Sequence, residues 1–187
     1  MCFFSPEDLS IIKNGPAERR HFLDSELCQL DKVYLYQLSN YNKVVLQRNK
    51  LLKELSFHPE YEETLDIWDL QLAQYGRQVI EYRTDFVKQL NEMIVGIHNQ
   101  LSGGKEHLEI FYEPNVEAEK LEDALAKNRD SDLRQRTTGI GPHRDDISFI
   151  VNGIDIRRFG SQGQQRTAAL SLKLSELELV KKVSRDD

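Results

Sequence analysis

A short run of small and amide residues, Ser161-Gln162-Gly163-Gln164, precedes a long apolar helical pattern that extends to about Lys182. The first N–H groups of a helix have no partner within the helix, and the helix dipole favours an anion at that end. The hydroxyl of Ser161 and the bare backbone of Gly163 could therefore bind a phosphate group. Spacing alone leaves a second interpretation open, in which Ser161 only caps the helix.

A second polar run, His143-Arg144-Asp145-Asp146, has residue types found in metal and acid–base sites. Adjacent residues do not face one another on regular structure, so this run favours a salt-bridged loop that braces the segment around Ser161. The cysteines, Cys2 and Cys28, lack the spacing of metal ligands. We therefore expect no metal site in this chain.

The overall charge argues against nucleic-acid binding through bulk electrostatics. The 187 residues include 31 acidic and 25 basic side chains, which gives a net charge of −6. Any DNA contact then needs a local basic patch. The candidates are Arg19, Arg20, Lys43, Arg48, Lys50 and Lys53, although a helix with such charges is also typical of a solvated face.

Nothing in the sequence predicts a membrane segment. No apolar run approaches the roughly 20 residues that span a bilayer, and the N-terminus lacks the layout of a signal peptide. Two cysteines without a pairing pattern fit a reducing compartment. We expect a soluble cytoplasmic protein that has no membrane partner.

Two heptad patterns, at residues 31–55 and 61–101, are separated by the breaker Ser56-Phe57-His58-Pro59. Apolar residues recur at steps of three and four, and Arg48 occupies one position of the first apolar seam. Two such helices joined by a tight turn predict an antiparallel helical hairpin. An ordinary helical bundle is the alternative.

The rest of the chain predicts a small β element and further helices. The pattern suggests a strand and short helices in 1–30, the hairpin arm in 31–104, and a subdomain with the Ser161 helix in 105–187. The fold class is therefore α+β, dominated by helix. The expected elements after the hairpin are a strand at 108–112, helices at 116–128 and 132–136, a loop at 137–142, and a β-hairpin at 147–151 and 154–157 around Asn152-Gly153.

Three separated segments carry a resemblance to a known family. Ser161-Gln162-Gly163-Gln164 resembles the signature motif of ABC-type ATPases, in the variant of the RecF family. Residues 137–146 (TTGIGPHRDD) resemble the family segment just upstream of that motif, and residues 6–9 (PEDL) with 15–24 (GPAERRHFLD) resemble another hallmark. The matches occur in the family's order and cover essentially the whole chain.

The departures from the family pattern concern the ATPase machinery. No G-x-x-x-x-G-K-[ST] phosphate loop occurs in these residues, and no apolar strand ending in two acidic residues follows the Ser161 helix. We therefore expect the chain to be a middle portion of a RecF-like protein, with Walker A before it and Walker B after it. The resemblance implies that the whole parent protein is a slow DNA-dependent ATPase. This portion alone should contain no catalytic residue and should not hydrolyse ATP.

The resemblance implies a protein that binds ATP, Mg²⁺ and DNA in the repair of single-stranded gaps. It implies an ATP-dependent homodimer in which Ser161 and Gly163 contact the γ-phosphate held by the other subunit, with Gln162 and Gln164 along the same edge. It also implies a Mg²⁺- or nucleotide-coupling loop at Glu7 and Asp8, where Asp8 could instead cap a helix. The implied partners are RecR, with RecO and RecA in the same pathway.

Two alternatives of another class remain open. A non-enzymatic coiled-coil adaptor would explain the hairpin, but it has no need for Ser161 at a helix start. An SMC-like structural module would also have paired helical arms, although its arms would be far longer than those predicted here.

Overall fold

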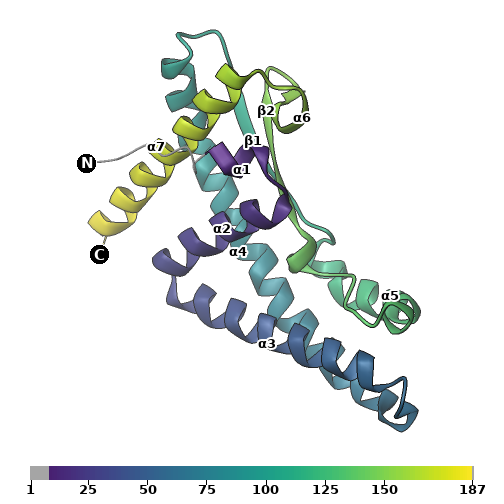
Figure 1. Ribbon diagram of the computed structural model, residues 1–187. Helices are drawn as coiled ribbons and strands as arrows, with labels where there is room; N and C mark the ends of the chain where they lie inside the picture. Colours follow the sequence, from purple (N-terminus) through teal and green to yellow (C-terminus); the bar gives the residue numbers. More distant parts are fainter. Residues whose placement is uncertain (1–8, 187) are drawn as a thin grey trace. The chain divides into compact units, whose positions relative to one another are not determined.

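The computed structural model describes residues 9–186, which form mostly helices and one small sheet (Figure 1). The α+β, helix-dominated fold class is confirmed. The chain divides into two compact units. The hairpin unit comprises Asp31–Tyr82 and Pro114–Asp145, and the sheet unit comprises the described residues up to Leu30, Arg83–Glu113 and the residues from Asp146 on.

These units are discontinuous, whereas the sequence was divided into consecutive segments with boundaries near residues 30 and 104. The reason is the length of α4 (Leu65–Leu101), whose residues up to Tyr82 belong to the hairpin unit and whose residues from Arg83 belong to the sheet unit. A heptad pattern identifies a helix face, but it does not show which partner that face covers at each turn.

The hairpin unit begins with α3 (Lys32–Glu54), which is capped by Asp31. The Asp31 carboxylate accepts hydrogen bonds from the backbone N–H groups of Val33 at 2.6 Å and Tyr34 at 3.2 Å. A 3₁₀ turn, η2 (Pro59–Thr64), connects α3 to α4. The second helix therefore starts at Leu65, four residues after the predicted position, because Pro59 and the 3₁₀ turn occupy the intervening residues.

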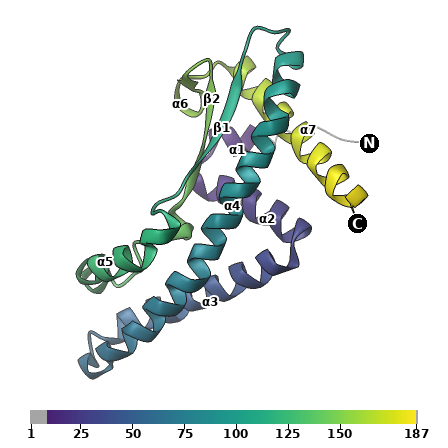
Figure 2. The ribbon, with the colours of Figure 1, turned by 180° about the vertical axis from the view of Figure 1, so that it is seen from behind.

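The two helices of this unit run antiparallel, as predicted (Figure 2). Tyr34 near the start of α3 meets Tyr82 in an edge-to-face contact with ring centroids 5.6 Å apart. At the other end, Leu52 and Leu65 belong to one buried apolar cluster. These contacts, one at each end of the helix pair, set the register of the two helices.

The remaining part of the hairpin unit contains η3 (Ala118–Lys120), α5 (Leu121–Gln135) and η4 (Pro142–Arg144). The two helices predicted at 116–128 and 132–136 are one helix, and this prediction was wrong. The polar stretch between them is not a break, because Arg129 and Asp132 both make ion pairs within this unit. The helix ends where Arg136 adopts a left-handed conformation with φ of 55°.

The sheet unit contains α1 (Ser10–Lys13), α2 (Pro16–Leu30) and a three-stranded antiparallel sheet in the order β1-β2-β3. The strands are β1 (Leu108–Glu113), β2 (Asp146–Val151) and β3 (Ile154–Asp155). Asn152 and Gly153 both have positive φ, as the predicted turn requires. The last predicted strand is shorter than expected, because Asp155 caps a short helix, α6 (Ile156–Phe159).

The outer edge of β1 is closed by a side chain from α4. Asn91 donates from Nδ2 to the carbonyl of Ile110 at 2.5 Å and accepts from the Ile110 N–H at 2.8 Å. One amide thus satisfies both backbone groups of Ile110 on the free edge of the strand. An edge strand with unpaired groups is a template for association, and Asn91 blocks the centre of this one.

The last element is α7 (Gln162–Asp186), whose buried face includes Ala168, Ala169, Leu172 and Leu179. Within residues 9–186, no helix combines the length and apolar character needed to cross a lipid bilayer.

Candidate functional site

The start of α7 is closed by a reciprocal pair of hydrogen bonds. The backbone N–H of Gln164 donates to Ser161 Oγ at 3.2 Å, and the backbone N–H of Ser161 donates to Gln164 Oε1 at 3.0 Å. This S-x-x-Q arrangement is a capping box. The capping role of Ser161 that the sequence left open is therefore present, and Gln164 shares it.

The capping box does not use every N–H group at this helix end. The N–H groups of Gln162 and Gly163 have no hydrogen-bond partner within the described chain, as is usual for the first positions of a helix. Ser161, Gln162 and Gly163 are exposed, and the space beside Gly163 is open apart from the Ser161 hydroxyl. The four predicted residues thus form one accessible helix end, with two free donors and one hydroxyl.

The chain enters this helix end through a close turn. Gln165 is buried, and its Nε2 donates to the carbonyl of Ile156 at 2.8 Å, which fixes the first turn of α7 against α6. A Cβ at Gly160 would lie 2.6 Å from Cβ of Ile156, so only glycine fits between the two helices. The position of Ser161 is therefore set by the packing of the residues on either side of it.

An ion cluster anchors the segment before Ser161. Arg157 donates to Asp155 at 2.8 Å, to Asp146 at 2.9 Å and to Glu113 at 3.1 Å. The hydrogen bond from the Arg157 side chain lowers the pKa of Asp155 below its usual value. Asp146 also accepts from Arg19 of α2 at 3.1 Å. This network ties α2, β1 and β2 to the short helix that leads into α7.

Further along, α7 packs through two titratable groups of the sheet unit. Buried His98 of α4 has Nδ1 2.9 Å from Ser171 Oγ and Nε2 3.2 Å from Glu106 Oε2, and burial lowers its pKa. Glu26 of α2 has its pKa raised to about 7, first by burial and then by the nearby carboxylate of Glu176. These contacts hold the body of the helix whose exposed end carries Ser161.

The side chains of the polar run 143–146 make hydrogen bonds and ion pairs that hold neighbouring segments in place. His143 has Nδ1 2.6 Å from the Tyr41 hydroxyl and Nε2 2.9 Å from the carbonyl of Thr138. Asp145 is buried and accepts from the backbone N–H of Asn115 at 2.7 Å. Among residues 9–186, no group of three or more His, Cys, Asp or Glu side chains could hold a metal ion.

The predicted DNA-contacting residues separate into two groups. Arg19 and Arg48 are buried, at 4% and 0% exposure, and their guanidinium groups are paired with carboxylates. As placed here they are not available to a phosphate, which corrects the expectation for these two. The other candidates are on or near the surface: Arg20 is half-buried, and Lys43, Lys50 and Lys53 are exposed. Glu7 and Asp8 lie outside the described residues.

Sequence reasoning missed a second group of cations in the hairpin unit. Arg134, Arg136 and Arg144 are exposed and have no carboxylate partner within residues 9–186. They lie in the last turn of α5 and the loop that follows it. The sequence does contain a signal for a basic surface, because three arginines and His143 lie within eleven residues. The family resemblance of 137–146 instead favoured a role for this segment in supporting the Ser161 helix.

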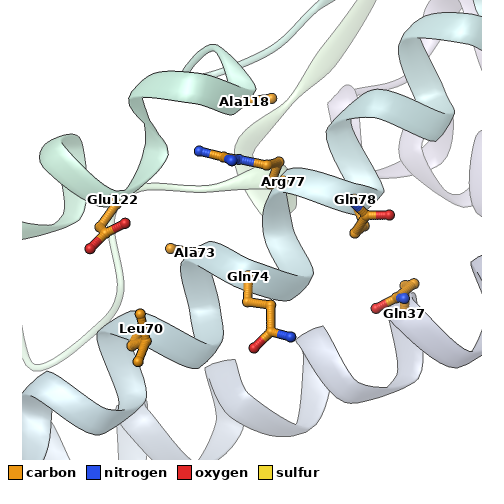
Figure 3. A pocket seen from close by; sticks show the side chains of 8 residues that line it. All are labelled: Gln37, Leu70, Ala73, Gln74, Arg77, Gln78, Ala118 and Glu122. Carbon is orange, nitrogen blue, oxygen red and sulfur yellow. The ribbon is translucent and has the colours of Figure 1, made fainter.

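The hairpin unit also has a pocket of about 510 Å³ between α3, α4 and the start of α5 (Figure 3). Arg77 extends from α4 toward the segment that carries Ala118 and Glu122. Its lining combines three amides, one cation, one carboxylate and small or apolar side chains: Gln37, Leu70, Ala73, Gln74, Arg77, Gln78, Ala118 and Glu122. This set has no nucleophile–base pair and no group of metal ligands.

Comparisons of sequence and of structure with known proteins both find RecF proteins. No family model matches the chain. The chain is 60% identical over 182 residues to the DNA replication and repair protein RecF of Agathobacter rectalis, which covers 97% of this chain and 50% of that protein. It is 57% identical over 186 residues to RecF of Lachnoclostridium phytofermentans, covering 100% of this chain and 52% of that protein.

A solved structure of the recombination mediator protein RecF with ATP, from the RecFOR pathway, superposes with a TM-score of 0.91 at 40% identity. That match covers 97% of this chain and 51% of the solved one. The chain thus spans about half the length of the curated relatives it matches. Over that half, in sequence and in fold, the chain belongs to the RecF family of DNA replication and repair proteins.

Proposed function

We propose that this chain supplies the arm and the signature helix of an ATP-dependent DNA-binding repair protein. In this proposal, Ser161, Gln162, Gly163 and Gln164 contact the γ-phosphate of an ATP molecule bound to a second subunit. The observation that carries the proposal is the exposed start of α7, where the N–H groups of Gln162 and Gly163 are free beside the Ser161 hydroxyl. The ATP-bound state of the matched RecF structure supports ATP as the ligand.

The chemistry of this helix end suits a terminal phosphate. Two N–H donors and the positive end of the helix dipole stabilise negative charge. The Ser161 hydroxyl accepts from Gln164 N–H in the capping box, and its own proton remains available for a phosphate oxygen. A dimer held through the γ-phosphate gains this stabilisation with ATP and loses it with ADP, which makes the contact a switch.

The wider assignment follows from the family. We propose that the protein acts on DNA at single-stranded gaps, with Mg²⁺ accompanying ATP and with Glu7 and Asp8 as the coupling loop. The RecFOR pathway named for the matched structures supports RecR and RecO as partners, with RecA further along the pathway. A coiled-coil adaptor remains the alternative, and it predicts no nucleotide effect on assembly.

The test is sedimentation velocity of the full-length protein that carries this chain, with ATP, with ADP and without nucleotide. Ser161→Arg places a bulky side chain at the helix start and should abolish an ATP-specific dimer. Ser161→Asp is the sharper variant, because aspartate caps a helix as well as serine does while its charge repels a phosphate. We expect this variant to keep the thermal stability of the wild type and to lose the ATP-specific dimer.

Two controls separate capping from phosphate binding. Ser161→Asn keeps a neutral cap and should retain more of the dimer than Ser161→Asp. Ser161→Ala loses the cap, at a cost of about 1 kcal/mol in stability. If Ser161→Asp dimerises with ATP as well as the wild type does, Ser161 is only a cap and the proposal for this helix end is wrong.

A further inference from the structure

A polar pocket of about 320 Å³ opens in the hairpin unit between α5 and the loop that follows it. Its lining residues are Asn115, Asn128, Ser131, Gln135, Gly139 and Arg144. Apart from the bare backbone of Gly139, all of these side chains are amide, hydroxyl or guanidinium groups. The pocket therefore offers hydrogen-bond donors and one positive charge, and its lining is mainly polar.

Unpaired cations surround this pocket. Lys127 and Arg134 lie four residues before and three residues after Ser131, so they are its neighbours on the surface of α5. Arg136 follows Gln135 directly, and Arg144 lines the pocket itself. All four cations are exposed, and none has a carboxylate partner within the described residues.

The interior arginines of this unit differ from these four cations, because the interior arginines are paired with carboxylates. Arg48 is bound by Asp69 and Asp132, and Arg129 is bound by Asp66 and Asp69. Asp66, Asp69 and Asp132 are thus occupied by these two arginines, whereas Glu122, Asp123 and Asp130 of α5 itself are exposed. Over residues 127–144, Asp130 is the exposed carboxylate that remains beside four unpaired cations. The local surface is strongly positive although the whole chain carries a net charge of −6.

We infer that this pocket and its surrounding cations form a contact site for the phosphodiester backbone of double-stranded DNA. The inference rests on the proposed DNA-binding function and gives it a location. Phosphate oxygens are bound in protein–DNA complexes by Arg and Lys together with Ser, Asn and Gln donors, which is the donor set found here. A protein partner would instead favour aromatic and apolar groups at the centre of the contact, and this pocket has none.

The donors that remain free support this assignment. Asn115 uses Oδ1 to accept from the backbone of Gly141 at 3.1 Å, which turns the amide so that Nδ2 is left as a donor. Gln135 donates to Ser131 Oγ at 3.1 Å, so the Ser131 hydroxyl proton is available to a phosphate oxygen. Arg144 makes one long hydrogen bond, 3.4 Å from Nη2 to the carbonyl of Thr138, and its remaining donors are unused.

The test measures binding of the full chain to a short fluorescein-labelled DNA duplex across a series of KCl concentrations. Each phosphate contact of a cation adds about 0.9 to the slope of log affinity against log salt concentration. The double variant Arg134→Gln, Arg144→Gln should therefore reduce the slope by about 2. The matched control, Lys88→Gln with Lys105→Gln, removes the same charge from exposed positions that are not candidates for a DNA contact, and should reduce the slope much less.

A neutral variant separates hydrogen bonding from charge. Ser131→Ala with Gln135→Ala removes donors without changing charge, so it should weaken binding several-fold and leave the slope unchanged. An equal loss of slope in the two double charge variants would indicate bulk electrostatics and overturn the inference. Displacement of the duplex by polyglutamate at equal charge concentration would also overturn it, because the surface would then be one for an acidic protein.

The outcomes also distinguish this site from the proposed function. If the wild-type chain binds the duplex and the Arg134→Gln, Arg144→Gln variant keeps the full slope, DNA binding stands and its location here is wrong. If the wild-type chain shows no salt-dependent binding, both the site and the DNA-binding role of this chain fail. The ATP-dependent dimer of the Ser161 experiment is unaffected by either result.

Discussion

Arg48 Nη1 lies 2.6 Å from Asp132 Oδ2, and this buried ion pair joins α3 to α5 across 84 residues of sequence. The same guanidinium donates from Nε to Asp69 at 2.6 Å and from Nη1 to Thr138 at 3.0 Å. Asn49 extends the network by accepting from both the N–H and the hydroxyl of Thr138. The loop that follows α5 is thereby fixed to the hairpin through charged and polar contacts.

Removing Arg48 should strongly destabilise the chain. Arg48→Met leaves the buried carboxylate of Asp132 without its charged partner and removes one of the two arginines that bind Asp69. Breaking such a buried pair costs about 3–5 kcal/mol. Urea denaturation of the full chain measures the loss. The control is Lys50→Met, because Lys50 is 72% exposed and its ion pair with Glu54, at 3.8 Å, contributes little.

A second variant tests whether the cost comes from the stranded charges. The double variant Arg48→Met, Asp132→Leu replaces this ion pair by apolar side chains and should recover part of the lost stability. If the double variant is less stable than Arg48→Met alone, the carboxylate of Asp132 is stabilised by its other partners, and our account of the network is wrong.

Stability should depend on pH through Glu26. Its folded-state pKa, about 7, lies above the ordinary value of 4.5, because the site is buried and Glu176 lies nearby. The folded chain therefore binds the proton more tightly than the unfolded chain. The resulting stabilisation is complete below pH 4.5 and is lost as the pH rises through about 7.

Glu26→Gln should flatten this dependence and stabilise the chain above pH 7, by about 1 kcal/mol after allowance for solvent screening. Urea midpoints measured between pH 5 and 8 would show the effect as a smaller fall with rising pH. Glu18→Gln, an exposed change on the same helix, controls for the loss of one acidic charge. An unchanged pH profile in Glu26→Gln would contradict the assignment.

Closure of the sheet edge by Asn91 gives a third prediction. Asn91→Ala leaves the N–H and carbonyl of Ile110 without their partner, which costs about 1–3 kcal/mol for a buried group. The opened edge should also promote concentration-dependent association. Thermal denaturation and light scattering measure the two effects, and Gln89→Ala, at an exposed position of α4, should change neither. Lower stability without association would restrict the role of Asn91 to hydrogen bonding.

Local patterns in the sequence predicted the features that depend on near neighbours. The break at Pro59, the Asn152-Gly153 turn and the helix start at Ser161 each follow from residues within a few positions. The seam position of Arg48 was also recognised, but its role was not. A cation on a helix gives no sign of a carboxylate 84 residues away, so the sequence alone makes Arg48 a candidate DNA contact.

The same limit explains the missed pocket beside α5. Whether Arg134 or Arg144 is available to a ligand depends on where Asp66, Asp69 and Asp132 find their partners, and those partners are Arg48 and Arg129. Net charge and helical spacing contain no information on this pairing. The tertiary structure decides which cations remain at the surface.

The last prediction concerns Gly141, which joins the loop after α5 to the hairpin. Its φ of 132° is in the region that favours glycine, and a Cβ there would collide with the hydroxyl of Tyr41. Because that hydroxyl is held by His143 at 2.6 Å, it cannot easily move aside. Gly141→Ala should therefore cost about 1–3 kcal/mol from backbone strain alone, with a steric cost in addition.

A double-mutant comparison separates the two costs. In a Tyr41→Phe background the colliding oxygen is absent, so Gly141→Ala should be less destabilising there than in the wild type, whereas the strain from φ remains. Urea denaturation of the four chains gives the coupling. Gly15→Ala is the control, because a Cβ at Gly15 meets no atom within 4 Å, and it should change stability little. If Gly141→Ala costs the same in both backgrounds, Tyr41 does not restrict this loop, and backbone conformation alone explains the glycine.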